Sequence, residues 1–179
     1  MSVTELSAVL WRERELLELL MFKLEEKQRV ISTGHVRWLG YATREVEQVL
    51  DKIRAAELER AVEANSVARG FDITPAGTLA ELASAAPQPW NELLSSHLEA
   101  FATLTDQIQD VARENRELLA TSLLATSTAT SRAGDDSSAA VYELRMQEIG
   151  YRGALGATAR VLQPSLLAFV SSPKPTPIA

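Results

Sequence analysis

The first stretch of the chain, residues 3–31, carries apolar residues at the heptad spacing of a coiled coil. The seam consists of apolar side chains seven residues apart, with two more at the intervening positions: Val3, Leu10, Leu17, Leu24 and Ile31, then Leu6 and Leu20. This spacing places a narrow apolar stripe along one face of a helix. A second row, Val9, Leu16 and Val30, widens the stripe, so we expect the helix to contact two others.

Two further long stretches repeat the pattern. Gly34 suits the residue just past a helix end, and apolar residues then recur every three or four positions through 35–69. A third seam runs through 89–126, with His97 and Asn115 as polar interruptions. Short connections favour antiparallel neighbours. The pattern predicts an all-α fold, an elongated antiparallel three-helix bundle or coiled coil.

A short helix is predicted between the second and third long helices. Thr78 and Glu81 have the spacing of a capping box, in which a threonine caps the helix and a glutamate three residues later caps the threonine. Pro87 ends this helix, and Pro89 suits the first turn of the next.

The composition changes after residue 125. Residues 125–140 are rich in Ala, Ser and Thr, so we expect the bundle domain to span 1–126 and a flexible linker to span 127–138. An apolar pattern then predicts an amphipathic helix over 139–170, which Pro164 should kink. Three glycines weaken this helix by about 1 kcal/mol each, so it needs another surface to be stable. Residues 171–179, with three prolines, should be disordered.

Composition excludes several classes of protein. The 179 residues contain no cysteine, which rules out disulfides and thiolate chemistry. The net charge of −6 argues against a nucleic-acid partner, because phosphate binding needs clustered Lys and Arg. No stretch suits a signal peptide or a membrane span, so we expect a cytoplasmic protein without membrane insertion.

The residues that could carry chemistry do not form a site. His35 and His97 are the only histidines and lack a ligand partner at metal-binding spacing, and no Glu-x-x-His motif is present. We therefore expect no metal, no cofactor and no catalytic residue. We expect Glu13, at a seam position, to set the register or to be partly exposed. The tryptophans Trp11, Trp38 and Trp90 should fill core at the bundle ends.

Several segments resemble FlgN-type flagellar export chaperones, in the form found in Gram-positive, actinobacterial systems. They are Leu10–Leu20, Gly34 with Arg37-Trp38-Leu39, Thr43-Arg44-Glu45-Val46, and Ala85-Ala86-Pro87-Gln88-Pro89-Trp90. The resemblance covers about residues 1–125. It implies a cytoplasmic chaperone of type III flagellar export. Such a chaperone binds the C-terminal helices of hook-associated junction proteins, prevents their premature assembly and aids delivery to the export apparatus.

The tail is similar to a different class of protein. Residues 146–167 resemble the C-terminal helix of flagellin-like junction proteins, the FlgL-type hook-associated class in particular, although such proteins usually end before the Pro-rich extension at 171–179. The chain would then join a chaperone to the recognition helix of its client. The linker suits a natural fusion or an engineered chimera, and we lean to the engineered one.

We expect the tail to dock on the bundle, in cis or by exchange between two chains. Its anchors should be Leu155, Leu162, Leu166 and Phe169. The partner-binding groove should be shared by the first and third long helices and lined by Leu16, Met21, Leu104, Ile108, Val111 and Leu119. The alternative is a structural or scaffolding bundle in which the tail is simply a fourth core helix.

Overall fold

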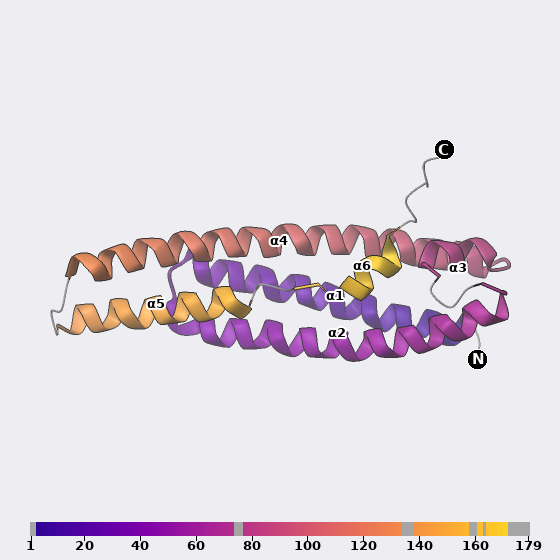
Figure 1. Cartoon of the computed structure of the whole chain (residues 1–179), viewed down its shortest axis with the longest axis horizontal. Helices are drawn as coiled ribbons and strands as arrows, with labels where there is room; N and C mark the ends of the chain where they lie inside the picture. Colours follow the sequence, from indigo (N-terminus) through magenta and orange to yellow (C-terminus); the bar gives the residue numbers. More distant parts are fainter. Residues whose placement is uncertain (1–2, 74–76, 134–137, 158–160, 163, 172–179) are drawn as a thin grey trace, which may run out of the picture. The chain divides into compact units, whose positions relative to one another are not determined.

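The computed structural model describes residues 3–73, 77–133, 138–157, 161–162 and 164–171 of the chain. Over these residues the chain forms six α-helices and no β-strand (Figure 1). The predicted all-α fold is therefore confirmed. None of the described helices combines the length and apolar character needed to cross a membrane.

The first two helices are joined by the tight turn that the sequence predicts. α1 spans Val3–Ser32 and α2 spans Val36–Gly70. Gly34 adopts a φ of +69°, a left-handed conformation that glycine reaches without steric strain. The turn makes the adjoining parts of α1 and α2 antiparallel neighbours, which an ion pair of 3.0 Å between Lys23 and Glu45 also connects.

The third helix begins with the predicted capping box. α3 spans Leu79–Ala85. The Glu81 amide donates to the Thr78 hydroxyl at 3.3 Å, and the Thr78 amide donates to the Glu81 carboxylate at 2.7 Å. Each side chain thus satisfies a backbone group that the helix itself leaves unpaired. Pro89 then precedes α4, as predicted.

The helix α4 is longer than predicted, because it spans Trp90–Ala133. The predicted linker is therefore wrong for residues 127–133. The hydroxyls of Thr126 and Thr130 donate to carbonyl oxygens four residues earlier, each at 2.9 Å, so these polar side chains find partners within the helix. The remainder of the predicted linker at 134–137 and the predicted disordered end at 172–179 lie outside the described residues.

The tail forms two helices where the pattern predicts a single kinked one. α5 spans Ala139–Ala157 and α6 spans Pro164–Val170. Pro164 lacks an amide hydrogen, so it suits the first position of α6 better than the interior of a continuous helix. The prediction of one helix over 139–170 is therefore wrong.

The chain divides into two compact units. Unit 1 comprises Met1–Glu18, Asp51–Asp106 and Leu162–Ala179, and unit 2 comprises Leu19–Leu50 and Gln107–Val161. Because these units interleave along the sequence, the predicted bundle domain at 1–126 is not itself one of them. α6 belongs to unit 1 and α5 to unit 2.

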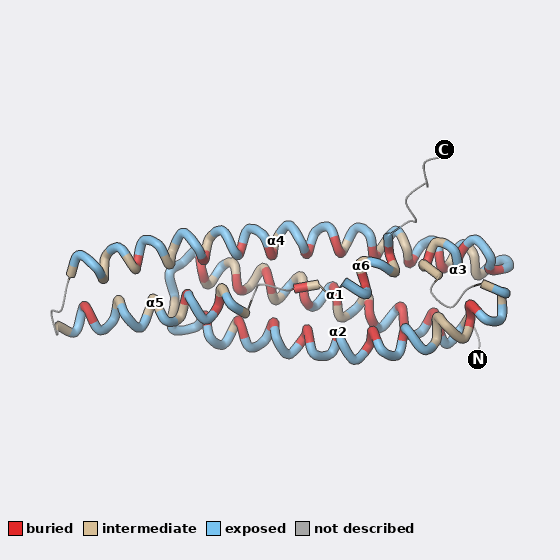
Figure 2. Tube along the Cα trace, viewed as in Figure 1, coloured by how far each residue is buried: buried red, intermediate tan, exposed pale blue. Residues whose placement is uncertain are grey.

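Each unit has its own apolar core, and buried positions recur along the long helices between exposed ones (Figure 2). In unit 1 the buried side chains include Leu6, Leu10, Leu17, Ile53, Leu82, Leu94, Phe101 and Leu166. In unit 2 they include Leu20, Leu24, Ile31, Leu39, Val46, Ile108, Leu119 and Tyr151. The predicted seam of α1 is thus buried from Leu6 to Ile31, which confirms its heptad register.

Candidate functional site

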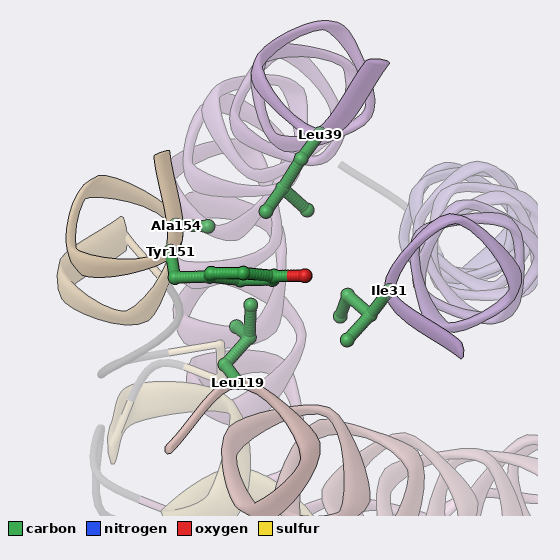
Figure 3. Packing of buried hydrophobic residues seen from close by; sticks show 5 residues of the cluster. All are labelled: Ile31, Leu39, Leu119, Tyr151 and Ala154. Atoms are coloured by element: carbon green, nitrogen blue, oxygen red, sulfur yellow. The ribbon is translucent and has the colours of Figure 1, made fainter. Parts of the chain in front are cut away.

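The tail helix α5 packs on an apolar surface of unit 2. Figure 3 shows the Tyr151 ring lying among Ile31 of α1, Leu39 of α2 and Leu119 of α4. Ala154 completes this buried cluster. Partly buried side chains packed around it are Val30, Val36, Leu118, Leu123 and Leu155. We call the α1, α2 and α4 members of this set the α5-docking surface.

One glycine of α5 lies close to this surface. A Cβ atom at Gly150 would lie 3.0 Å from the Cγ1 atom of Val36, closer than almost any real contact, whereas Cβ atoms at Gly153 and Gly156 would meet nothing within 4 Å. Of the three glycines, Gly150 is therefore the one at which an added methyl group would press on the Val36 side chain.

A buried lysine contacts the backbone of α5. Lys27 of α1 is 0% exposed, and its Nζ atom donates to the Ala154 carbonyl oxygen at 3.4 Å. Burial lowers the pKa of Lys27 to about 8, against the opposing effect of the Glu47 carboxylate. At neutral pH the Lys27 side chain is therefore still mostly protonated.

The second tail helix, α6, meets a more polar surface in unit 1. Leu166 is fully buried, and α6 packs against α3. The Ser165 hydroxyl donates to the Glu57 carboxylate at 3.1 Å, and the Arg60 guanidinium lies over the Phe169 ring at 4.5 Å. A pocket of about 240 Å³ lies beside these contacts and is lined by Glu57, Arg60, Ala61, Ala64, Asn65, Gly77, Ser165, Ala168 and Phe169.

A buried charge cluster underlies this contact. The Arg60 Nε atom lies 3.4 Å from the Glu13 carboxylate and its Nη2 atom lies 3.9 Å from Glu57. Burial raises the pKa of Glu13 to about 7, although Arg60 opposes the shift. Burial also raises the pKa of Glu57 and lowers that of Arg60. Desolvation therefore outweighs the attraction between these charges.

The predicted groove residues fall in both units. Leu16 and Leu104, in unit 1, are half-buried. In unit 2, Met21 and Val111 are half-buried, and Ile108 and Leu119 are fully buried. The cluster beneath α5 includes one of the six, Leu119. That these side chains bind a partner stays a prediction.

The predicted tail anchors also divide between the units. Leu155 packs on the α5-docking surface, whereas Leu166 and Phe169 lie on α6 in unit 1. Leu162 is half-buried and follows α5 and precedes α6 in the sequence. Tyr151, which was not predicted as an anchor, is a member of the buried cluster of unit 2, whereas Leu155 packs against that cluster.

Two charged residues were harder to place from sequence. Glu13 and Lys27 both occupy positions of the α1 heptad that Leu6 and Leu20 also occupy, and both are 0% exposed. Of the two expectations for Glu13, partial exposure is therefore wrong, and a register-setting role stays a prediction. The heptad register itself was the signal that could have identified Lys27.

The aromatic and histidine side chains differ in how well they follow expectation. Trp11 and Trp38 are each 47% exposed, so the prediction that they fill core is wrong. Trp90 is half-buried. His97 is buried, with its Nε2 atom 3.5 Å from the Ser7 hydroxyl. Among the described residues, no group of three or more His, Asp or Glu side chains could hold a metal ion.

Residues 1–135 match the family model described as FlgN protein. The chain matches no curated protein and no solved structure. The matched region contains α1 to α4 and ends before α5 begins. Since the match covers most of the chain, this protein belongs to the FlgN family, and membership implies the role of a flagellar export chaperone.

Proposed function

We propose that this chain is a cytoplasmic export chaperone that binds the C-terminal amphipathic helix of hook-associated junction proteins. It prevents their premature assembly and aids their delivery to the flagellar export apparatus. The observation that carries this proposal is the position of α5. This amphipathic helix lies outside the matched residues 1–135, yet its apolar face is buried on the α5-docking surface.

The mechanism that this packing supports is recognition of a helix in an apolar groove. A subunit that later packs inside a filament exposes an apolar stripe beforehand, and covering the stripe blocks assembly. α5, Ala139–Ala157, occupies this surface as a client-like helix would. Glycines within it raise the cost of ordering, so docking stays reversible despite the buried area.

The proposal includes no cofactor and no catalysis. In unit 1 the Arg60 guanidinium lies within ion-pair distance of Glu13 and Glu57, and in unit 2 the Lys27 Nζ atom donates to a backbone carbonyl oxygen. Stoichiometric zinc, iron or manganese in the purified protein would contradict this part of the proposal.

The burial of Tyr151 and Leu166 also suits the alternative, a scaffolding bundle in which the tail is a permanent core element. The two functions differ in what happens when the tail is released. A chaperone exposes its client-binding surface, and a scaffold only loses stability.

Two tyrosines on α5 allow a matched test in the full chain. Tyr151 is 6% exposed and Tyr142 is 67% exposed. Tyr151→Asp should release α5, whereas Tyr142→Asp adds the same charge on the outer face. Fluorescence anisotropy would measure binding of a labelled peptide with the sequence of a junction-protein C-terminal helix.

We expect Tyr151→Asp to bind this peptide roughly tenfold or more tightly than the parent, because the competing tail is removed. Tyr142→Asp should bind like the parent. Absence of peptide binding to a folded Tyr151→Asp variant would favour the scaffold. Sedimentation of the parent decides whether the tail docks in cis or by exchange in a dimer.

A further inference from the structure

An exposed face in the first turns of α2 combines aromatic rings with arginines. Arg37, Tyr41 and Arg44 are spaced by four and then three residues, so they lie along one face of the helix. Trp38 flanks this face, with its ring centroid 5.7 Å from that of Tyr41. The Trp38 side chain is 47% exposed and the Tyr41 side chain 62% exposed. We call these four residues, all in unit 2, the α2 surface patch.

The guanidinium group of one arginine lies over each ring of the patch. The Cζ atom of Arg37 lies 4.6 Å from the centroid of the Trp38 ring, and the Cζ atom of Arg44 lies 6.0 Å from the centroid of the Tyr41 ring. A planar guanidinium that lies over a ring still presents N–H groups along its edge. The patch therefore offers apolar ring surface and hydrogen-bond donors side by side.

Neither arginine of the patch forms an ion pair with a residue that the structure describes. Lys23 of the same unit differs, because its Nζ atom lies 2.7 Å from the Glu26 carboxylate and 3.0 Å from the Glu45 carboxylate. Although the whole chain has a net charge of −6, no carboxylate of the described residues is paired with these two guanidinium groups.

The chemistry of the patch limits what can cover it. Single exposed apolar residues are ordinary, but Trp, Tyr and Arg together are the residue types that dominate binding energy at protein interfaces. A partner that covered the patch with apolar side chains alone would remove water from two guanidinium groups without replacing it. A basic partner would be repelled. Carboxylates supply both the opposite charge and the paired acceptors that a guanidinium prefers.

We propose that the α2 surface patch binds an acidic segment of another protein. Arg37 and Arg44 are seven residues apart, which is about 10 Å along the helix axis. A helix lying alongside α2 with two carboxylates at the same spacing meets both guanidinium groups, and an apolar side chain midway between them contacts the two rings. This partner differs from the proposed client helix, which is recognised by its apolar stripe.

A nucleic acid also combines negative charge with groups that stack on aromatic rings. The negative net charge of the chain opposes a polyanion, and two exposed glutamates, Glu45 and Glu47, follow Arg44 closely in the sequence. The observations therefore favour a short acidic protein segment.

Titration of the full chain, followed by nuclear magnetic resonance, tests the proposal. The probe is a synthetic alanine-based helical peptide of about twenty residues, with two glutamates seven residues apart and a leucine midway between them. A second peptide has glutamine in place of both glutamates. The indole N–H signal of Trp38 reports binding at the patch, and the amide signals of α5 report whether the tail stays docked.

We expect the glutamate peptide to shift the Trp38 signal in a saturable manner. It should bind about three- to tenfold more tightly than the glutamine peptide, the effect of two partly exposed ion pairs. Arg37→Gln and Arg44→Gln should each reduce this difference. Arg37→Lys should reduce it as well, because an ammonium group neither stacks as a plane nor binds a carboxylate with two parallel hydrogen bonds. The amide signals of α5 should keep their positions.

Arg116→Gln is the matched control. Arg116 of α4 is also exposed, belongs to unit 2, and has neither an ion pair nor a ring contact with a described residue. Its substitution removes the same charge and should leave the difference between the two peptides unchanged.

Three results would overturn the proposal on the peptide side: equal binding of the two peptides, binding of neither, or a difference that Arg37→Gln leaves intact. Tighter binding of a single-stranded oligonucleotide than of the glutamate peptide would assign the patch to nucleic acid instead. Self-association of the chain that Arg37→Gln abolishes would assign it to a second copy.

Discussion

The two tail helices dock on surfaces of different chemistry. α5 places Tyr151 among aliphatic side chains of unit 2, and the charged partner that we describe there, Lys27, contacts the backbone of the tail. α6 places Ser165 and Phe169 against Glu57 and Arg60, which belong to a buried charge cluster of unit 1.

The surfaces beneath α5 and α6 both include a buried charged residue of the α1 seam. This heptad seam carries one charged residue in each unit, Glu13 in unit 1 and Lys27 in unit 2. Lys27 reaches its tail helix directly, and Glu13 acts through Arg60. α5 thus combines aliphatic contacts with a hydrogen bond from a buried lysine, whereas α6 combines the burial of Leu166 with polar contacts to Glu57 and Arg60.

The largest expected effect comes from substitutions in the apolar seam of α1, each of which should unfold the unit that it belongs to. Leu17 and Leu20 are both 0% exposed, one in unit 1 and one in unit 2. An aspartate at either position buries a carboxylate without a partner, which costs several kcal/mol, comparable to the stability of a whole domain. We expect Leu17→Asp and Leu20→Asp to unfold their units in circular-dichroism melts. Leu19→Asp, at an exposed position of the same helix, is the control and should melt like the parent.

A smaller effect should separate the two units by their response to pH. The pKa of Glu13 is raised from 4.5 to about 7 in the folded protein, so the folded state binds this proton more tightly than the unfolded state. Its contribution to stability is complete below about pH 4.5 and is lost as the pH rises towards 7. The groups facing Glu13 are Arg60 and Glu57 of α2, and the raised pKa of Glu57 acts in the same direction.

We therefore expect unit 1 to lose about 1–3 kcal/mol of unfolding free energy between pH 5 and pH 8, on the scale of 1.36 kcal/mol for each pKa unit. Hydrogen exchange, corrected for intrinsic rates, would resolve this loss in α6 and in residues 51–70 of α2. Glu13→Gln should reduce it. An equal loss in both units would assign the effect to general charge rather than to this cluster.

The smallest effect distinguishes two glycines of α5. Gly150→Ala forces a methyl group against Val36, and we expect it to weaken α5 docking by about 1–3 kcal/mol, as overpacking does. Gly153→Ala has open space and should strengthen α5 by about 1 kcal/mol through helix propensity. Thermal melts of the two variants should move in opposite directions, and a shift in the same direction would show that α5 is not seated against α2.

The regular part of this fold was predictable because one pattern repeats. The heptad seam of α1, the Gly34 turn and the capping box at Thr78 all follow from local spacing. The end of α4 could not be predicted from local spacing. Residues 127–133 are helical despite few apolar side chains, and the Thr130 hydroxyl donates to a carbonyl oxygen of the same helix.

The candidate site was predictable only in part. Apolar periodicity indicated that the tail is amphipathic, and Leu155 and Leu166 do lie at contacts. Spacing alone could not show that the tail breaks into two helices with different partners. Nor could it show that a lysine at a heptad position would be buried, because burial of a charge depends on partners distant in the sequence.

The central claim, that the tail docks on the surface of unit 2 through α5, is tested most directly by hydrogen exchange of the intact chain. The account predicts that amides of residues 144–157 are protected well above intrinsic rates. Tyr151→Asp should abolish this protection while α1 stays protected, and Tyr142→Asp should leave it unchanged. Exchange of α5 amides at random-coil rates in the parent chain would contradict the account.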